Sequence, residues 1–415
     1  MTLTRTRRGV VVACSAAVVV MLAAVIGLAM INRPGDEPAV AETPWESAGP
    51  AVLAAPPDGA FRHPGVLIGA DELARIKERV DAGTEPWASA FAQMAGTRYG
   101  KADWQPRPRA VVECGPYSDP DLGCTEEAED GVAAYTQALL WNLTGDRAHA
   151  QAAIRIIDAW AAVLESHTNV NGPLQSAWSA VPMVRAAELI RYSYDGWDPA
   201  PAEAMFRDVY LPEVIGGATW TNGNWELIMM EAATGIAVFL DDRASFDRAV
   251  ARFRERVKAY IYLTSDGPLP VAPPGETDVP EGRLIGYWQG QETFVDGLTQ
   301  ETCRDFGHTG WGLSAASHVA ETARLQGLDL WSEIQPRMVA ALELHMPYAL
   351  GEKAPSWLCD GEPDTESYAP LPEAARHHLV DRLGLDLPGT TAYVRKYRPA
   401  EAAYFFAWET VTHGG

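Results

Sequence analysis

The run Gly312-Leu-Ser-Ala-Ala-Ser-His-Val-Ala-Glu-Thr-Ala-Arg-Leu-Gln326 places small and apolar side chains at spacings of three and four residues. Leu313, Ala316, Val319 and Ala320 then share one face of an α-helix, because the helix completes a turn in about 3.6 residues. We predict a helix over residues 312–326 that buries this face in the core.

Segments with the same spacing occupy most of the chain from Leu67 onward. They cover residues 133–143, 148–164, 177–194, 202–210, 225–239, 245–262, 312–326 and 330–346. Short stretches such as Thr144-Gly145-Asp146 separate them, and these residue types are typical of helix ends and starts. Consecutive helical hairpins close most economically into a ring around a central cleft. We therefore expect one all-α domain over residues 65–415.

Residues 266–290 interrupt this pattern with a span rich in proline and glycine. Irregular loops of such length inside compact domains are usually functional. Tyr287 lies in this loop, and its phenol is a candidate proton donor for a cleft. The alternative is that Tyr287 only anchors the loop.

The composition limits the classes of partner. The 415-residue chain is 47% hydrophobic, which is enough for one large core. Its formal net charge of -22 argues against nucleic acid, because such a partner requires a basic surface. The 14 tryptophans are consistent with a carbohydrate cleft, since indole can stack on a sugar ring, but each can equally fill space between helices.

The N-terminal segment predicts export. Arginines at positions 5, 7 and 8 precede an uninterrupted apolar run from Gly9 to Ile31. Such a run is long enough to cross a bilayer and is longer than the apolar core of a usual signal peptide. The positively charged residues before it stay on the cytoplasmic side of the membrane. We expect residues 1–31 to form a transmembrane anchor that holds an exported domain at the cell membrane.

Residues 32–64 are rich in proline, alanine and glycine and predict a flexible tether. Ala39-Val40-Ala41 within it is a possible peptidase site, and cleavage after Ala41 would give a secreted protein. Because this site lies far beyond the apolar run, we favour the retained anchor.

Export permits disulfides, and the cysteines after the apolar run form an even set. Cys114 and Cys124 flank a loop with few apolar residues to hold it, so we pair them. Cys303 and Cys359 are the remainder. A bridge between them would join the Arg304 region to a C-terminal loop.

Polar groups gather in the run Gln300-Glu-Thr-Cys-Arg-Asp-Phe-Gly-His-Thr-Gly-Trp311, just before the helix predicted at residues 312–326. Arg304, Asp305 and His308 stand where unpaired backbone N–H groups and the helix dipole favour an anion. His308 lies four residues after Arg304, on the same side of any helical turn they share, and is the best candidate for proton transfer. A lone histidine is, however, more often structural.

Four segments in this order resemble the alginate lyase family of polysaccharide lyases, roughly between Gly65 and Tyr348. They are Leu174-Gln-Ser-Ala-Trp178, Met183-Val-Arg-Ala-Ala-Glu188, Asn222-Gly-Asn-Trp-Glu226 and Glu301-Thr-Cys-Arg-Asp-Phe-Gly-His308, the last followed by Gly-Leu and Ala-Glu321. The resemblance implies an α/α toroid, a cleft for an acidic polysaccharide, and β-elimination at a uronic acid.

In that reaction a base removes the proton from the carbon next to the carboxylate, and an acid donates a proton to the leaving oxygen. A further group must neutralise the carboxylate. By resemblance, the neutralising amide is Asn224 and the arginine is Arg304. Two positions depart from the family: Trp225 stands where these lyases have His, and Trp311 where they have Tyr. Indole is a donor only and cannot replace either group in proton transfer.

Further residues are expected to line the substrate cleft. These are Asn222, Gln175, Trp178 and Glu301, together with Trp225 and Trp311 as stacking platforms. The run Thr-Asn-Gly-Asn also suits a turn and a helix cap before Trp225, so Asn222 and Asn224 have a structural alternative.

Two other functions stay open at this point. A glycoside hydrolase on the same helical ring could use Glu226, Glu301 or Asp305 as its acid and base. A membrane-tethered glycan-binding protein could have kept the cleft without turnover. The nine histidines do not fall at metal-ligand spacings, so we expect neither a metal nor another cofactor.

Overall fold

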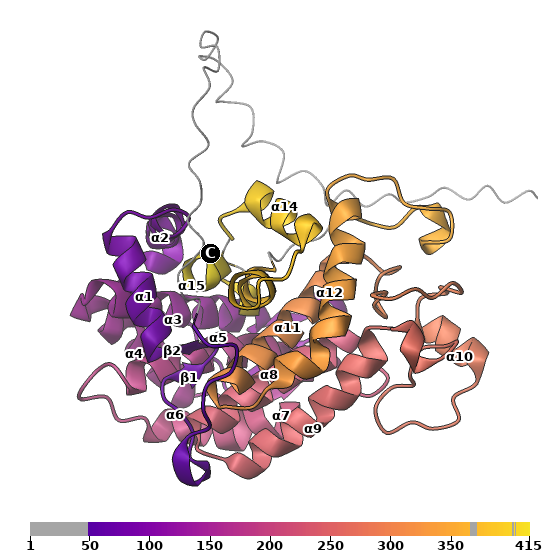
Figure 1. Cartoon of the computed structure of the whole chain (residues 1–415). Coiled ribbons are helices and arrows are strands. Elements are labelled where there is room, and N and C mark those ends of the chain that lie inside the picture. The colour runs from indigo at the N-terminus through magenta and orange to yellow at the C-terminus, as the bar shows by residue number, and fades with distance from the viewer. Residues whose placement is uncertain (1–48, 366–371, 401, 403) are drawn as a thin grey trace, which may run out of the picture. The chain divides into compact units, whose positions relative to one another are not determined.

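Four long and almost wholly buried helices form the interior of the fold. They are α3 (Cys124–Thr144), α5 (Gly172–Arg191), α8 (Gly223–Phe239) and α11 (Phe306–Leu325). In the computed structural model, which describes residues 49–365, 372–400, 402 and 404–415, α3 packs against α5, α5 against α8, and α8 against α11 (Figure 1). These helices are buried on all sides, which explains why small and apolar residues dominate them.

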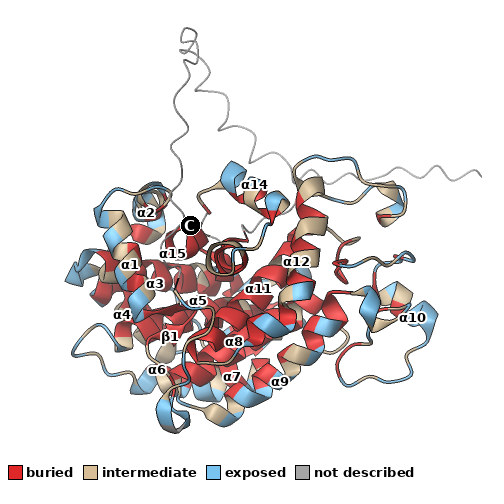
Figure 2. Cartoon of the chain, viewed as in Figure 1, coloured by how far each residue is buried: buried red, intermediate tan, exposed pale blue. Residues whose placement is uncertain are grey.

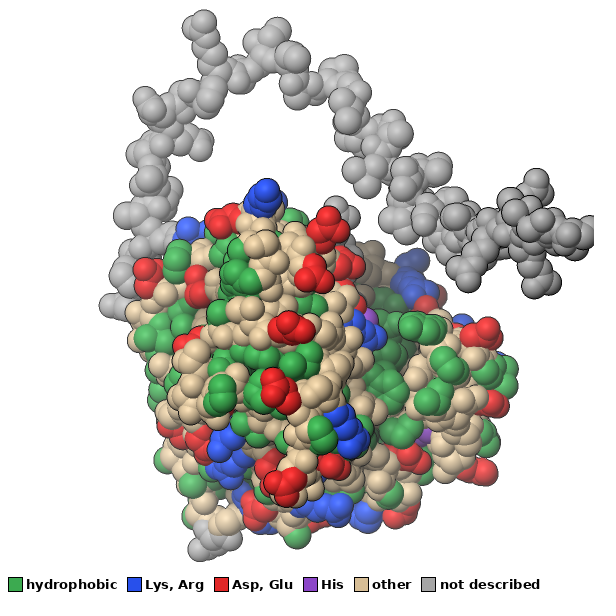
Figure 3. Space-filling view, turned by 90° about the vertical axis from the view of Figure 1, so that its right-hand side faces the viewer, with side chains coloured by type: hydrophobic (Ala, Val, Ile, Leu, Met, Phe, Trp, Pro, Cys, Tyr) green, Lys and Arg blue, Asp and Glu red, His purple; other side chains and the backbone are tan. Residues whose placement is uncertain are grey.

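Amphipathic helices alternate with the inner ones along the chain and cover them from outside. They are α4 (Arg147–Ala161), α6 (Ala200–Met205), α7 (Leu211–Val214), α9 (Arg243–Tyr260) and α12 (Leu330–Ala349). In α9, for example, Phe246 and Phe253 are buried while Asp247 and Glu255 are exposed. Figure 2 shows the same division between buried inner helices and outer helices with one exposed side. On the face of the molecule in Figure 3, acidic, basic and hydrophobic side chains are interspersed.

The remaining helices are shorter, and some of them complete the ring. They are α1 (Ala70–Asp81), α2 (Trp87–Gly96), α10 (Glu281–Tyr287), α13 (Glu373–Arg376), α14 (Pro388–Tyr397) and α15 (Glu409–His413). Helix α11 contacts α13, α13 contacts α15, α15 contacts α1 and α2, and α1 contacts α3. Contacts thus return from the last inner helix to the first, and the predicted ring of helical hairpins is confirmed.

Strands among the described residues are short, and the first two are buried against inner helices of the ring. They are β1 (Gly65–Val66), β2 (Ile68–Gly69), β3 (Val111–Cys114), β4 (Asp121–Leu122) and β5 (Ser166–Thr168). The first two form an antiparallel hairpin with Val66 opposite Ile68. Strand β3 pairs with β4 antiparallel and with β5 parallel.

Single turns connect several of these elements. The 3-10 turns are Pro57–Gly59, Arg98–Gly100, Pro116–Ser118, Thr264–Asp266, Cys359–Gly361 and Tyr404–Phe406, and the π-helical turns are Phe206–Tyr210 and His377–Arg382. The first π-helical turn lies inside the single helix predicted at residues 202–210 and joins α6 to α7.

Two sequence-based boundaries are corrected. Helix α11 begins at Phe306 instead of residue 312, because the Asp305 side chain accepts the main-chain N–H of His308 and caps the helix there. His308 and Trp311 therefore belong to the helix. The span 266–290 is not wholly irregular either, since its last part forms α10 and Tyr287 is the final residue of that helix.

The predicted anchor at residues 1–31 and the site after Ala41 lie outside the described residues. Within the described part of the chain, no helix combines the length and apolar character needed to cross a bilayer. The described end of the predicted tether packs on the domain: Phe61 is buried in the core, and Nδ1 of His63 lies 2.8 Å from the Glu188 carboxylate. Ordered packing thus begins before residue 65.

Both predicted disulfides, Cys114–Cys124 and Cys303–Cys359, are present. The first closes the loop between β3 and α3. The second ties the segment that precedes α11 to the turn at Cys359–Gly361.

Candidate active site

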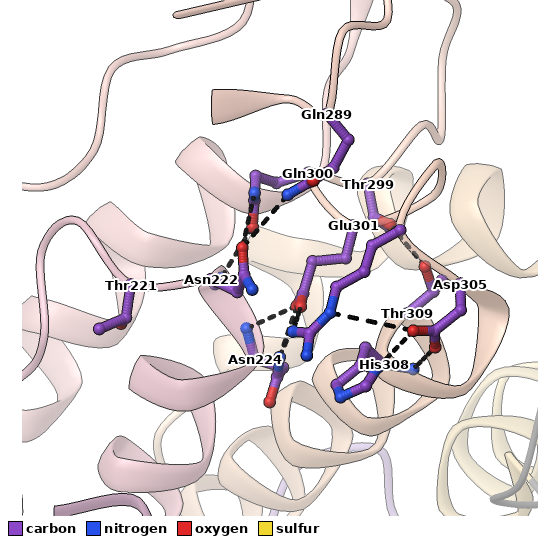
Figure 4. A network of polar contacts seen from close by, with 12 residues as sticks. Thr221, Asn222, Asn224, Gln289, Thr299, Gln300, Glu301, Asp305, His308 and Thr309 are labelled. Atoms are coloured by element: carbon purple, nitrogen blue, oxygen red, sulfur yellow. Dashed lines mark hydrogen bonds and ion pairs between the residues drawn. The ribbon is translucent and has the colours of Figure 1, made fainter. Parts of the chain in front are cut away.

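A buried carboxylate joins the starts of α8 and α11. Glu301 is fully buried and accepts hydrogen bonds from the main-chain nitrogen of Asn224 at 3.0 Å and from its side-chain Nδ2 at 2.7 Å to each oxygen (Figure 4). Nη1 of Arg304 donates to the same carboxylate at 2.8 Å. The sequence placed Asn224, Glu301 and Arg304 near one cleft, and Glu301 is in direct contact with the other two.

The direction of the Asn224 amide follows from this contact. Because Nδ2 faces a carboxylate, the amide oxygen Oδ1 must face away from it. Oδ1 is buried and has no hydrogen-bond partner among the described residues. Arg304 differs, since its side chain is 26% exposed and retains access to solvent.

A second polar pair adjoins the first. The Asp305 carboxylate accepts the main-chain N–H of His308 at 2.7 Å, and its Oδ2 lies 2.6 Å from Nδ1 of that imidazole. Nε of Arg304 is 3.9 Å from the same Oδ2. Burial alone would raise the pKa of Asp305, but the hydrogen bonds from His308 and the charges of His308 and Arg304 lower it below its ordinary value.

The contact with Asp305 decides which nitrogen of His308 donates a hydrogen bond and which can accept a proton. An ionised carboxylate only accepts, so Nδ1 donates to it, and in the neutral imidazole Nε2 is the nitrogen that can take a proton. The His308 side chain is 30% exposed. This arrangement suits a general base.

Tyr260, at the end of α9, fixes the approach of the two inner helices. A Cβ on Gly223 would lie 2.2 Å from its ring, and a Cβ on Gly312 would lie 2.3 Å from its hydroxyl oxygen. Only glycine therefore allows α8 and α11 to press against this ring. The hydroxyl also donates to the carbonyl of His308 at 3.2 Å.

Asn222 is the N-cap residue of α8, but its side chain makes no capping hydrogen bond. Its Oδ1 instead accepts from Gln300 and Gln289, at 3.3 Å each. The structural alternative, a side-chain cap, is therefore wrong for Asn222. Gln300 holds the helix start by another route, since its Oε1 accepts the main-chain N–H of Gly223 at 2.8 Å.

The contacts of Tyr287 favour its role as a loop anchor. Its hydroxyl donates to the carbonyl of Thr221 at 2.8 Å and accepts from Nη1 of Arg256 at 2.9 Å. Burial is the chief cause that raises the pKa of Tyr287 to about 12. A hydroxyl with partners on both sides and so high a pKa is poorly suited to give up a proton.

Glu226 belongs to the framework rather than to a cleft. It is fully buried, and its carboxylate pairs with both Arg252 and Arg256 of α9. It also accepts the main-chain N–H of Ala218 at 3.1 Å. With both oxygens engaged, Glu226 cannot be half of the acid and base pair that a hydrolase requires.

Aromatic rings extend the site away from His308. The Trp311 ring lies 5.3 Å from the His308 ring and 5.4 Å from that of Trp178, measured between centroids. The Tyr404 ring lies 5.7 Å from Trp311 and 5.1 Å from Trp178. Trp225, the other expected stacking residue, is half-buried in the first turn of α8. The structure supports a stacking role less well for Trp225 than for Trp311.

Gln175 and Trp178 line a cavity of about 250 Å³. The Gln175 amide is buried and donates to the carbonyl of Cys124, to Glu127 and to Ser179, at 2.8 to 2.9 Å. The sequence did not indicate the other lining residues, which include Tyr99, Thr125, Glu129 and Tyr404. No short motif marks them, because they come from distant segments.

Among the described residues, His, Cys, Asp and Glu side chains form no group of three that could hold a metal ion.

The alginate lyase family model matches residues 116–271 of the chain. The fold is similar to that of alginate lyase A1-III from Sphingomonas species A1, with 15% identity, a TM-score of 0.57, and coverage of 87% of this chain and 99% of that one. An alginate lyase from Bacteroides ovatus has 16% identity, a TM-score of 0.56, and coverage of 85% and 99%.

A variant of A1-III complexed with a tetrasaccharide is similar at 16% identity, with a TM-score of 0.56 and coverage of 82% of this chain and 93% of that one. A search of curated proteins finds no match. The resemblance inferred from the sequence is confirmed. The family match includes Asn224 but ends before Glu301 and Arg304, so the likeness over that half of the site is one of fold alone.

Proposed function

We propose that this chain, which matches the alginate lyase family over residues 116–271 and shares the alginate lyase fold, is a polysaccharide lyase that cleaves a uronic-acid-containing polysaccharide by β-elimination. One observation carries the proposal: at the starts of α8 and α11 the partly exposed Arg304 guanidinium contacts the buried Glu301 carboxylate, and beside it the His308 imidazole contacts Asp305.

Arg304 is the group that meets the carboxylate of the sugar. Elimination requires a proton to leave the carbon next to this carboxylate, and its negative charge makes that carbon a weak acid. A fixed cation stabilises the charge that develops in the transition state. Glu301 holds one nitrogen of Arg304, which fixes the direction of the guanidinium while its exposed part faces solvent.

His308 is the group that takes the proton. Nε2 accepts the proton from the carbon next to the carboxylate, the electron pair of that C–H bond forms a carbon–carbon double bond, and the glycosidic C–O bond breaks. The leaving oxygen then needs a proton, and the imidazolium of His308 can return one. Asp305 holds Nδ1 throughout and stabilises the positive ring.

A hydrolase finds less support. It needs one carboxylic acid that keeps its proton and one carboxylate near the bond that breaks. Glu226 is paired with two arginines, and Glu301 is covered by Asn224 and Arg304. The pKa of Asp305 is lowered, which is the wrong direction for an acid.

Export is part of the proposal. The apolar run from Gly9 to Ile31 and its basic flank support an N-terminal anchor. The disulfides Cys114–Cys124 and Cys303–Cys359 support an oxidising compartment outside the cytoplasm. Protection of the domain from protease added to intact cells would contradict this location.

The activity is tested with purified protein and alginate or another polyuronate. A lyase creates an unsaturated uronate that absorbs in the near ultraviolet, with one new reducing end for each such double bond. Reducing ends without that absorbance would show a hydrolase. Retention on the immobilised polymer with neither signal would show a binding protein and overturn the proposal.

A further inference from the structure

A chain of buried hydrogen bonds connects α12 with the two segments that carry the candidate site. Its members are His345 of α12, Thr302 and Thr299 of the segment that precedes α11, and Thr309 of the first turns of α11. Each of these residues is at most 2% exposed. Oγ1 of Thr302 lies 2.9 Å from Nε2 of His345 and 3.0 Å from Oγ1 of Thr299. That oxygen lies 3.0 Å from Oγ1 of Thr309 (Figure 4).

The protonation of His345 sets the direction of these hydrogen bonds. Its Nδ1 lies 2.7 Å from the carbonyl oxygen of Ala341, which can only accept, so Nδ1 carries a proton. Burial is the chief cause that lowers the pKa of His345 to about 4. The ring is therefore neutral near neutral pH, and its Nε2 accepts. The hydroxyl that faces Nε2 is that of Thr302, which must then be the donor.

The other two hydroxyls are oriented as a consequence. A hydroxyl has a single proton, and that of Thr302 is directed at the imidazole, so its oxygen accepts from the hydroxyl of Thr299. The same oxygen also accepts the main-chain N–H of Thr299 at 2.9 Å. Thr299 in turn accepts from Thr309. Every donor in the chain thus points toward His345, and this order requires an acceptor at Nε2.

The chain reaches both parts of the candidate site. Glu301, the partner of Arg304, stands between the two threonines of the segment that precedes α11. Thr309 directly follows His308 on α11. A shift of either segment would therefore change the position of the guanidinium relative to the imidazole of His308.

Loss of the acceptor on α12 would have a directional effect. A buried hydroxyl without a partner keeps its full desolvation cost, so the Thr302 hydroxyl would turn to another acceptor and disturb the segment that carries it. The imidazole also packs against Phe306, with 4.9 Å between the ring centroids. A test of His345 must therefore separate its hydrogen bond from its packing.

We propose that His345 is a positioning residue for the lyase reaction. Through the three threonine hydroxyls it fixes the segment of Glu301 and Arg304 against the start of α11, which carries His308. It touches no reacting atom, because it is fully buried on α12. The inference rests on the proposed lyase function, and the residue lies outside the match of the family model to residues 116–271.

Two amide variants separate the hydrogen bond from the packing. In His345→Gln the side-chain oxygen can take the place of Nε2 and accept from Thr302, whereas in His345→Asn the shorter amide lies near Nδ1 and leaves that hydroxyl without an acceptor. Both variants remove the ring that packs against Phe306. On polyuronate we expect kcat to fall on the order of 10–10² in His345→Asn and less than about threefold in His345→Gln, because a small displacement of a reacting group has a large effect on rate. KM should stay within about threefold in both, since His345 does not contact the sugar.

A second pair tests the next link of the chain. Thr302→Val removes the hydroxyl at similar volume and should lower kcat as His345→Asn does, whereas Thr302→Ser keeps the hydroxyl and should retain kcat. Thr390→Val is the matched control, because it removes another buried hydroxyl, which donates to Glu343 of α12 at 2.7 Å. It should lower Tm and leave kcat unchanged. Thermal unfolding followed by circular dichroism gives the Tm of each variant, and kcat is measured well below it.

The outcomes separate the positioning role from the lyase function. Equal kcat in His345→Asn and His345→Gln, whether retained or lost, would overturn the positioning role and leave the lyase function standing, because packing alone treats the two amides alike. Where either of these variants fails to fold, equal kcat in Thr302→Val and Thr302→Ser would overturn it in the same way. Loss of kcat confined to His345→Asn and Thr302→Val supports it. Absence of cleavage by the unsubstituted chain would overturn the proposed function, and the positioning role with it.

Discussion

Asn224 and Glu301 lie 77 positions apart in the chain, yet the main-chain nitrogen and the side-chain amide of the first both donate to the carboxylate of the second. This contact fastens the first turn of α8 to the segment that leads into α11. It also occupies the donor nitrogen of the buried Asn224 amide and fixes the direction of the Arg304 guanidinium. Glu301 is therefore a positioning residue on which both candidate groups depend.

Removal of this carboxylate should destabilise the protein. Glu301→Ala leaves the buried Asn224 amide without its acceptor, and an unsatisfied buried polar group typically costs about 1–3 kcal/mol. Denaturant unfolding measures the change. Glu333→Ala is the matched control, since its pair with Arg254 is exposed on both sides and should contribute less than about 1 kcal/mol. Equal losses in the two variants would contradict the positioning role of Glu301.

Arg304→Ala should act on the chemical step. Without the guanidinium, charge that develops on the sugar carboxylate has no fixed cation, and we expect kcat/KM on polyuronate to fall on the order of 10²–10³. The initial rate of ultraviolet absorbance measures this. Arg254→Ala, a change at an exposed arginine, should keep the original rate. Unchanged kinetics in Arg304→Ala would remove this residue from carboxylate recognition.

His308→Ala should abolish turnover but spare glycan binding. A positioned general base contributes roughly 10²–10⁴ to the rate, whereas the imidazole is not needed to hold the sugar chain. Tetrasaccharide calorimetry and the ultraviolet assay report the two effects separately. His149→Ala changes a histidine on α4, outside the proposed site, as the control. Full activity in the His308 variant would exclude it as the base.

We expect the free energy of unfolding to fall at alkaline pH because His318 loses its proton there. Burial alone would lower the pKa of this imidazole, but Glu231 and Glu409, each 2.9 Å from one ring nitrogen, raise it to about 9 from an ordinary 6.5. The folded pKa lies above the unfolded one. The stabilisation is therefore complete below about pH 6.5 and is lost as the pH rises toward about 9.

The loss should amount to a few kcal/mol, on the order of 1.4 kcal/mol for each unit of pKa difference. Urea unfolding between pH 6 and pH 9, a range chosen to span both values, measures it. The His318→Gln variant removes the titrating group and should flatten this dependence. An equally steep slope in His318→Gln would assign the effect to other groups.

Local chemistry made part of the site predictable. An acidic residue before Phe306 is a typical signal for a helix start; our prediction of residues 312–326 missed it, and the structure uses Asp305 as that cap. The candidate groups Arg304 and His308 were found because charged side chains are concentrated next to that start. The cysteine pairs followed from an even count and a poorly held loop, and both are present.

Other parts of the site depend on partners that no local pattern reveals. Tyr287 was a candidate acid until its hydroxyl was seen between Arg256 and the carbonyl of Thr221. Glu226 was a candidate for hydrolysis, but two arginines of α9 neutralise it. The sequence shows that a phenol or a carboxylate is present, but not which groups surround it. Its neighbours in the folded protein decide whether it is protonated and whether a substrate can reach it.

The sequence by itself determined the helical ring, because the spacing of apolar residues acts within a few turns of each helix. It also determined where polar chemistry is concentrated. Only the tertiary structure decided that Asn224 faces Glu301 and that Tyr404 closes a cavity with Tyr99 and Trp178. The physical reason is range: helical periodicity is a local property, whereas hydrogen bonds and cavity walls join residues tens to hundreds of positions apart, which meet only when the ring closes.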